Sequence, residues 1–281
     1  MIKTLALLIS LTVVCSQPVF AQLSNPLEQL SAGNFEAVEN TYSALQTRFE
    51  RGLATEYDLL DAYKVFYQRD DRYTEQLTNW IKHYPQSASA YLARGVYYRK
   101  LGEFRRGTSY ISQVPIDNVK YMEQMFVLSK KDLQTALRLN PKSYLAILHL
   151  LNIAQFEGDD RAATKYLVLG NVVLPSNFIV RARYLIHLAP KWGGSYTSME
   201  NFIDECRSQG LSPQKVDMLM AIKLDDQGMS AQERGQMGQA RLAYVNALIL
   251  SRSAGERFRH SYLQYSLQIC RGSDSDKEYC H

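Results

Sequence analysis

The chain has 281 residues, of which 46% are hydrophobic and 21% charged, and its formal net charge is +4. This length can bury a large core, either as one domain or as a stack of repeats that grows by addition. The basic residues are dispersed and their excess is small. The sequence therefore does not predict nucleic acid or an anionic membrane surface as a partner.

The first 21 residues have the three zones of a secretory signal peptide. A basic start with Lys3 precedes an apolar run over Leu5–Val14, and Val19 and Ala21 supply the small residues of a cleavage site. We therefore predict cleavage after Ala21 and a soluble mature protein that is periplasmic or secreted. Removal of residues 1–21 takes away one lysine and leaves 31 basic and 28 acidic residues, a net charge of +3.

Two other interpretations of this N-terminus stay open. One is a buried N-terminal helix, and the other is lipid attachment at Cys15, although Val14 is a poor match to the small residue that usually precedes a lipidated cysteine. The apolar run is too short to span a bilayer and no second run follows it. We therefore do not expect stable membrane insertion after cleavage.

The rest of the chain has the pattern of helices. Apolar residues recur at three- and four-residue spacing, and no segment alternates with the period of a strand. Gly33 and Gly102 interrupt these helical blocks and are expected in the turns after the first and the fifth helix. The helices expected in this part of the chain cover Pro26–Ala32, Asn34–Glu50, Thr55–Gln68, Arg72–His83 and Ala88–Leu101.

The middle of the chain contains one irregular segment and one regular helix pair. Pro115 interrupts the expected pattern, and a new helix is expected from about Asp117 to Leu139. The next 34 residues, Tyr144–Asn177, predict two antiparallel helices with Gly158 in the turn and Pro175 after the second helix. The apolar face of this pair consists of Ile147, Leu150, Leu151, Ala154, Ala163, Leu167 and Gly170.

The last third of the chain also has a helical pattern. Gly193 and Gly194 allow a tight turn, after which Ser195 or Thr197 can cap a helix. Thr197 with Glu200 also matches a capping box. The helices expected here cover Phe178–Leu188, a segment that ends near Ser208, Pro213–Asp226, Met229–Ser253 and Arg257–Ile269.

The Tyr144–Asn177 segment resembles a tetratricopeptide repeat (TPR) in its period and in the order of its small and large apolar residues. Residues 88–104 and 129–141 resemble parts of further repeats. The resemblance implies an all-α fold, a TPR-like α-α solenoid built as a right-handed superhelix of antiparallel helix pairs, with about 11–12 helices. The repeat domain is expected over residues 22–269, and residues 270–281 remain as a polar C-terminal tail.

The TPR resemblance also implies a binding groove, because the first helix of each pair lines the concave face of such a solenoid. Carried over by register, the groove positions are Arg99, His149, Asn152, Gln155 and Arg183. The resemblance implies that Asn152 hydrogen-bonds the backbone of a bound peptide. Arg99 and Arg183 can bind a carboxylate through their planar guanidinium groups. The alternative is that these polar residues only face water.

No catalytic motif accompanies this pattern. The five histidines are scattered, and neither a zinc-protease motif nor a phosphate-binding loop is found in the sequence. Ser195 follows two glycines, but helix capping explains it better than a nucleophile does. Trp192 is a secondary candidate binding residue, with packing as the alternative. The acidic pair Asp225–Asp226 lacks the further oxygen ligands of a calcium site, so no metal and no cofactor are predicted.

Three cysteines follow the predicted cleavage site, Cys206, Cys270 and Cys280. A Cys270–Cys280 disulfide would close a loop of about eleven residues and stabilise the fold by roughly 2.5–3 kcal/mol. A Cys206–Cys270 disulfide is the alternative, and the sequence does not decide between them. Zinc ligation by these residues with His281 is disfavoured because the paired spacing of zinc sites is absent.

We interpret the chain as an exported, non-catalytic helical-repeat protein that binds a protein or peptide partner in the cell envelope. A segment within it, LAPKWGGSY, also resembles the P-K/R-WGGS motif of an uncharacterised bacterial family, which implies no activity. The alternatives are an enzyme or enzyme accessory domain with a site near Arg181–Tyr196, and a self-assembling structural protein. A deep polar cavity with a perturbed ionisable group would favour the enzyme. The partner and the oligomeric state stay open.

Overall fold

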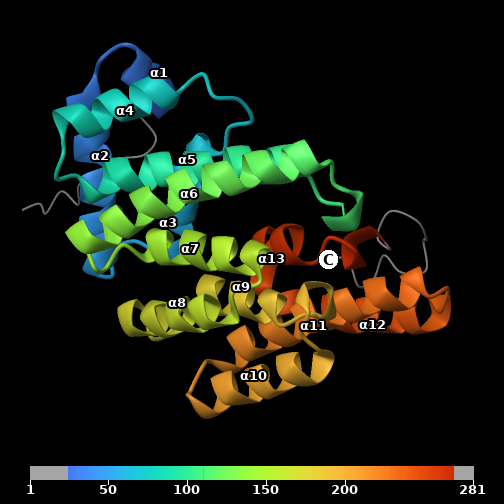
Figure 1. The fold of residues 1–281 in the computed structure, drawn as a ribbon. Coiled ribbons are helices and arrows are strands. Elements are labelled where there is room, and N and C mark those ends of the chain that lie inside the picture. The colour runs from blue at the N-terminus through green and yellow to red at the C-terminus, as the bar shows by residue number, and fades with distance from the viewer. Residues whose placement is uncertain (1–24, 110, 269–281) are drawn as a thin grey trace, which may run out of the picture.

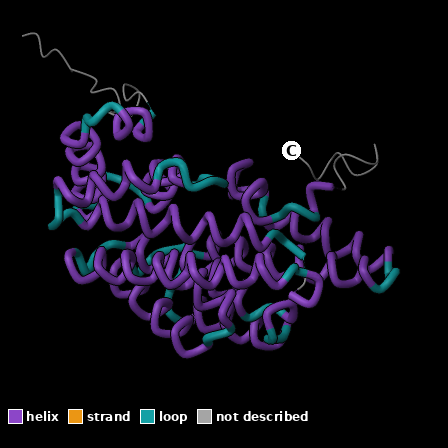
Figure 2. The backbone as a smooth tube through the Cα atoms, turned by 45° about the horizontal axis from the view of Figure 1, so that its top comes forward, coloured by secondary structure: helices purple, strands orange, loops and turns teal. Residues whose placement is uncertain are grey.

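The computed structural model describes residues 25–109 and 111–268, and these residues form helices and loops without a strand (Figure 2). The prediction of an all-α fold is confirmed. Within the same residues, no helix is both long enough and apolar enough to cross a membrane. The predicted signal peptide, residues 1–21, and the predicted tail, residues 270–281, lie outside the described part of the chain.

The N-terminal helices pack around a cluster of aromatic rings. The ring of Tyr42 lies 4.8 Å from that of Tyr63, 5.4 Å from that of Phe66 and 5.8 Å from that of Trp80. Thr55 caps the third helix through a capping box with Asp58. The four helices are α1 (Pro26–Ser31), α2 (Phe35–Glu50), α3 (Glu56–Tyr63) and α4 (Thr74–His83).

The fifth and sixth helices, α5 (Ala88–Arg106) and α6 (Ile116–Leu139), form a long antiparallel pair. The prediction of a turn at Gly102 is wrong, because α5 continues to Arg106. Gly102 lies inside the helix, and a side chain there would meet the Met122 carbonyl oxygen at 3.1 Å. Its role is close helix crossing, and Gly107, at φ +76°, ends the helix instead.

The regular pair predicted for Tyr144–Asn177 is present as α7 (Tyr144–Glu157) and α8 (Asp160–Val173). Gly158 ends α7 in the left-handed conformation, and Asp159 caps α8. Every residue of α7 from Tyr144 to Gln155 is buried, so this helix lies at the centre of the molecule.

Four further helices follow the α7–α8 pair and form two more antiparallel pairs. Ser195 caps the first turn after the two glycines, and Thr197 forms no capping box. The boundary predicted near Gly228 is wrong: the helix continues through Gly228 to Glu233, and the turn lies at Gly235. These helices are α9 (Ile179–His187), α10 (Tyr196–Ser208), α11 (Pro213–Glu233) and α12 (Met237–Leu250).

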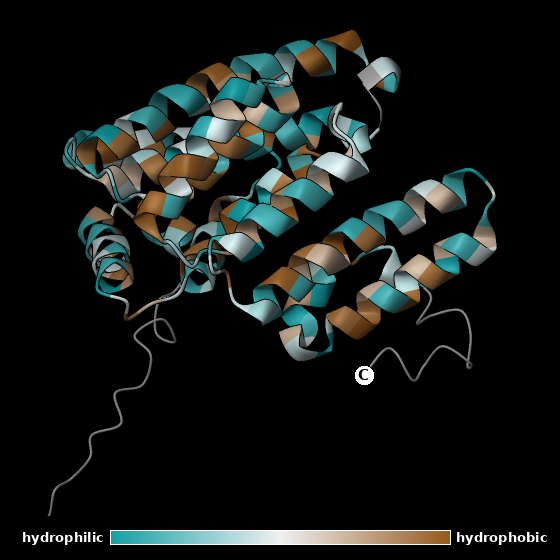
Figure 3. Ribbon diagram, turned by 90° about the horizontal axis from the view of Figure 1, so that it is seen from below, coloured by the Kyte–Doolittle hydropathy of each residue, from teal (hydrophilic) through white to brown (hydrophobic). Residues whose placement is uncertain are grey.

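The helix pairs stack in chain order (Figure 1), and hydrophobic and hydrophilic residues alternate along the helices (Figure 3). The pairs are α5–α6, α7–α8, α9–α10 and α11–α12, and the first helix of each pair contacts the first helix of the next. Each of α6, α8 and α10 contacts its own partner and the first helix of the next pair. The N-terminal helices join this stack through contacts of α2 and α4 with α5 and of α3 with α7.

The last helix, α13 (Gly255–Tyr262), is shorter than the predicted Arg257–Ile269 and folds back onto the stack (Figure 1). Its Phe258 ring lies 5.6 Å from that of Phe178, and Arg257 pairs with Asp61 of α3. Contacts between residues almost 200 positions apart therefore bring the C-terminal part of the chain against α3.

Candidate functional site

Four of the five predicted groove residues line a single cavity of about 170 Å³, which we call the basic cavity. Arg99 comes from α5, His149 and Asn152 from α7, and Arg183 from α9. The fifth, Gln155, lies beside Arg183. The remaining lining residues are Leu60, Lys64, Tyr67, Lys100, Leu148, Ile179, Ser261 and Tyr262.

Arg99 and His149 form a buried polar pair at the centre of this cavity. Arg99 Nε donates to His149 Nδ1 at 2.9 Å, and its Nη1 donates to Glu103 at 2.8 Å. Since a guanidinium N–H only donates, Nδ1 is the acceptor and the neutral imidazole carries its proton on Nε2. Burial and the neighbouring Arg99, Lys100 and Arg183 hold the pKa of His149 well below its usual value, so the ring stays neutral.

Lys100 and Glu103 complete the charge cluster. Both Arg99 and Lys100 contact the same oxygen of Glu103 at 2.8 Å. Burial opposes ionisation of Glu103, but the two cations outweigh it and lower its pKa to about 2. Burial and the adjacent Arg99 lower the pKa of Lys100 to about 8. The Glu103 carboxylate is thus the counter-ion of both Arg99 and Lys100.

Arg183 has fewer polar partners than Arg99 does. Its Nη1 donates to Gln155 Oε1 at 3.3 Å, and no carboxylate pairs with it among the described residues. Burial lowers its pKa from the usual value. Gln155 is 2% exposed, and its Nε2 has no hydrogen-bond partner in the described part of the chain. An unpartnered amide N–H therefore lies beside the cavity, next to Arg183.

Asn152 differs from the other predicted residues, because its Nδ2 donates to the Leu148 carbonyl of its own helix at 2.9 Å. The sequence did not indicate Tyr67, Lys100 or Tyr262 as part of the site. Lys100 follows Arg99 directly, yet adjacent helical residues point in different directions, and so no spacing rule selects both. Tyr262 reaches the cavity only because α13 folds back.

Trp192, the secondary candidate, lines a neighbouring hollow of about 290 Å³, which we call the aromatic groove. Its ring packs edge-on against Phe156, 5.3 Å away, and Arg106 lies over the same Phe156 ring at 5.6 Å. Arg183 lines both this groove and the basic cavity. The other lining residues are Glu103, Phe104, Gly107, Thr108 and Lys191.

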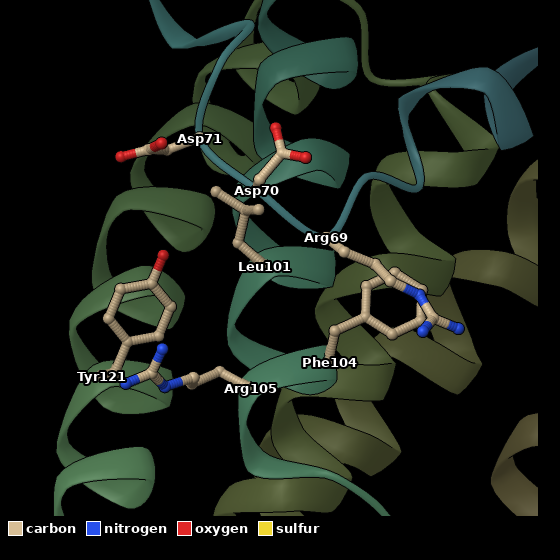
Figure 4. A pocket seen from close by; sticks show the side chains of 7 residues that line it. All are labelled: Arg69, Asp70, Asp71, Leu101, Phe104, Arg105 and Tyr121. Atoms are coloured by element: carbon tan, nitrogen blue, oxygen red, sulfur yellow. The ribbon is translucent and has the colours of Figure 1, made fainter.

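A larger open hollow of about 600 Å³ continues from the aromatic groove along α5 (Figure 4). The two share Phe104, over whose ring the Arg69 guanidinium lies at 5.0 Å. Arg105 lies 5.7 Å from the Tyr121 ring on the opposite wall. The basic cavity, the aromatic groove and this hollow thus adjoin one another, and aromatic rings and cationic groups line all three. The remaining lining residues are Asp70, Asp71 and Leu101.

Trp192 also borders a cavity of about 180 Å³ that contains Asp225 and Asp226, close to the segment proposed for an enzyme site. Burial raises the pKa of Asp225 to about 6 and raises that of Asp226. Asp225 Oδ1 accepts from the amide and the hydroxyl of Ser266, and Asp226 Oδ2 accepts from Tyr196 at 2.9 Å. Both carboxylates thus have hydrogen-bond roles within the fold.

Other sequence candidates have structural roles. Arg181 donates from Nη1 to the carbonyls of Pro175 and Asn177, both at 2.9 Å, and Ser195 caps α10. Cys206 is buried and free, and burial raises its thiol pKa to about 11. The candidate pair Cys270 and Cys280 lies outside the described residues. Within residues 25–109 and 111–268, no group of three or more His, Cys, Asp or Glu side chains is arranged to hold a metal ion.

Comparison of the chain with protein-family models, with curated protein sequences and with solved structures finds no match in any of the three. The function of these sites is therefore inferred from the side chains that line them.

Proposed function

We propose that this protein is an exported, non-catalytic TPR-like solenoid that binds a protein or peptide partner along its first helices. One observation carries the proposal. The aromatic groove collects aromatic rings and cationic side chains from three successive first helices, α5, α7 and α9, and it includes Arg183, one of the residues selected by repeat register. Side chains brought together in this way are typical of a binding surface.

The solenoid interpretation is supported by the order of contacts. First helices contact first helices along the chain, and each second helix packs between two of them, as in a stack of helix hairpins. The α7–α8 pair has the length and the turn of the repeat that its sequence resembles.

The lining of the aromatic groove indicates the chemistry of the partner. Phe104, Phe156 and Trp192 offer ring faces, and Arg106, Arg183 and Lys191 outnumber the single carboxylate of Glu103. Aromatic anchors surrounded by cationic groups favour a segment that carries apolar and acidic side chains. We therefore propose an acidic, aromatic-containing peptide segment as the ligand of this groove.

Binding accounts for the structure better than catalysis does. The ionisable groups with the clearest shifts near Trp192 are Asp225 and Asp226, and each accepts hydrogen bonds from the protein. Ser195 uses its hydroxyl oxygen to cap α10. The Ser266 hydroxyl that donates to Asp225 is fully buried, so it is not open to a substrate as a nucleophile has to be.

The binding proposal can be tested with Trp192 as the reporter. The chain has two tryptophans, and Trp80 is fully buried, so a Trp80→Phe background leaves a single ring in the groove. We expect acidic, aromatic peptides to change the Trp192 emission, and basic peptides with the same aromatic residues to have little effect. Arg106→Glu should weaken acidic-peptide binding about tenfold, since it reverses one charge that borders the groove.

The matched control for this experiment is Lys131→Glu, which makes the same charge change on the exposed surface of α6. It should bind like the parent protein. Equal weakening by Arg106→Glu and Lys131→Glu, or no response of Trp192 to either peptide class, would contradict the groove as the binding site.

Export is a separate part of the proposal, and it rests on the three-zone pattern of residues 1–21. Expression of the full chain in a bacterial host should yield a protein that begins at Gln22. Mass spectrometry of the N-terminal peptide would show this, and an intact Met1 terminus on the folded protein would contradict it.

A further inference from the structure

We propose that the basic cavity binds phosphate, either free or as a small phosphomonoester. This ligand goes beyond the peptide proposed for the aromatic groove, and either site can exist without the other. The inference rests on three properties of the cavity: its charge, its unpartnered donor and its small volume.

Every charged residue that lines the cavity is cationic: Lys64, Arg99, Lys100 and Arg183. Three carboxylates lie next to them: Glu103 pairs with Arg99 and Lys100, Asp61 pairs with both Lys64 and Arg257, and Glu56 accepts from the amide of Ile179 in the cavity wall. With Arg257 included, five cations face three carboxylates. The neutral His149 adds no charge. The lining thus has about two positive charges more than its own counter-ions supply.

This excess matches phosphate better than a single carboxylate. A phosphate monoester carries a charge of about −1.5 to −2 near pH 7 and offers three acceptor oxygens. A carboxylate would neutralise only one of the two surplus charges. Burial of a cation that has no counter-ion is unfavourable, and Arg183 has no carboxylate partner among the described residues, so a dianion would compensate its charge.

Hydrogen-bond donors for such an anion are already in place. His149 is fully buried, lines the cavity and has no partner for its Nε2 in the described chain, and the tautomer fixed by Arg99 puts the proton on that atom. Arg183 contributes a planar fork, of which one nitrogen donates to Gln155. His149, Arg183 and Lys100 therefore border the same cavity.

The cavity is suited to a small ligand. Its volume is about 170 Å³, and Ser261 and Tyr262 of α13 form part of its wall. Phe258 and Arg257 hold α13 against Phe178 and Asp61. A free ion or a short ester fits beneath this helix, whereas a longer segment would have to displace it.

The test is a calorimetric titration of the full mature chain with sodium phosphate, sodium acetate and sodium chloride at one ionic strength. We expect saturable binding of phosphate and no measurable binding of acetate or chloride. Equal behaviour of the three salts would overturn the proposal, since it would mean that the cavity shows only general ionic effects. A thermal-shift series in the same salts gives a second readout.

Variants place the binding site in the cavity. Arg183→Gln should weaken phosphate binding at least tenfold, because it removes the guanidinium that lacks a carboxylate partner. Lys131→Gln, on the outer surface of α6, should stay within about twofold of wild type. If Arg183→Gln does not fold, as circular dichroism would show, Lys100→Gln provides the same test. Unchanged phosphate affinity in a folded cavity variant would overturn the assignment.

Further titrations identify the source of the phosphate. Glycerol phosphate should bind with an affinity similar to that of inorganic phosphate, and a phosphoserine peptide should bind at least tenfold more weakly because α13 limits the space. Tighter binding of the phosphopeptide would overturn the small-ligand assignment. Lys100 lines the basic cavity and not the aromatic groove, so peptide titration of Trp192 in Lys100→Gln reports on the groove alone. Loss of phosphate binding with retention of peptide binding, or the reverse in Arg106→Glu, shows which of the two proposals fails.

Discussion

The helices of the stack meet two contrasting environments. Where neighbouring helices cross, small residues bring them together: a side chain at Gly95 would lie 2.8 Å from Leu133, and one at Gly170 would lie 2.7 Å from Val180. On the side facing the basic cavity, α5, α7 and α9 instead carry Arg99, His149 and Arg183. The first environment is apolar and closely packed, and the second is buried but charged.

The difference shows how one set of helices combines stability with binding. Close crossings bury apolar area and stabilise the stack by roughly 25 cal/mol for each Å² removed from water. Buried cations that lack counter-ions contribute little to stability and can lower it. A ligand of opposite charge is the simplest physical reason for their presence. The following variants test this contrast, in order of decreasing expected effect.

The largest loss is expected where a buried charge has all its partners. Glu56 of α3 is 5% exposed and accepts from the amides of Phe178 and Ile179, at 2.8 and 2.9 Å, and from the Tyr144 hydroxyl. Glu56→Ala would leave these donors unpaired and should lower the unfolding free energy by about 3–5 kcal/mol in urea denaturation. Glu56→Gln keeps acceptor oxygen and should lose less. A loss below about 1 kcal/mol for the alanine variant would refute this account.

Asp225 should give a pH-dependent effect of about 3 kcal/mol. Burial raises its folded pKa to about 6 from the usual 3.8, so the folded state binds its proton more tightly than the unfolded state does. The resulting stability is fully present below pH 3.8 and is lost as the pH rises through 6, roughly 3 kcal/mol for a shift of about two units. Asp225→Asn should lack this term while keeping an acceptor for Ser266.

The measurement is the unfolding free energy of both proteins in urea between pH 3.5 and 7.5. The difference between variant and wild type should move in favour of Asp225→Asn as the pH rises. Parallel profiles would show that Asp225 titrates normally in the folded protein.

Gly228 tests the close crossing of α11 and α12. A β-carbon there would lie 2.4 Å from the Tyr244 ring, whose hydroxyl donates to Gln232 at 2.9 Å. Gly228→Ala should therefore lower the unfolding free energy by about 1–3 kcal/mol through overpacking, despite the better helix propensity of alanine. The control is Gly238→Ala on α12, where the added carbon meets nothing within 4 Å and should gain up to about 1 kcal/mol. Similar changes at both positions would contradict the close-contact argument.

Gly228 and Gly102 also show where sequence-based prediction of this fold fails. Helical periodicity located most helices within a few residues, since apolar spacing depends only on local geometry. The sequence pattern predicts a helix boundary at both glycines, because a glycine beside acidic or aromatic residues has the same local pattern in a turn and at a close crossing. Tyr244 and Met122, which distinguish the two roles, are distant in sequence.

The candidate site was predictable to the extent that it follows repeat register. Arg99, His149, Asn152 and Arg183 occupy equivalent faces of successive helices, and the structure brings them to one cavity. The part of the cavity wall formed by α13 could not be foreseen, because Tyr262 is far from these residues in the chain and α13 is held by contacts with distant segments. Register gives the face of a helix, whereas burial depends on which distant segment covers it.

The smallest change in stability is expected for Arg183→Met, which tests most directly whether the basic cavity contributes to ligand binding and not to stability. Arg183→Met should alter the unfolding free energy by no more than about 1 kcal/mol in phosphate-free buffer, because the cation removed has no carboxylate partner and the thioether fills similar space. At a phosphate concentration ten times the dissociation constant, wild type should gain about 1.4 kcal/mol and the variant nothing. Urea denaturation in both buffers measures both quantities. A loss of several kcal/mol without phosphate would instead assign Arg183 to the stabilising framework, because it would show that the guanidinium is already satisfied by the protein alone.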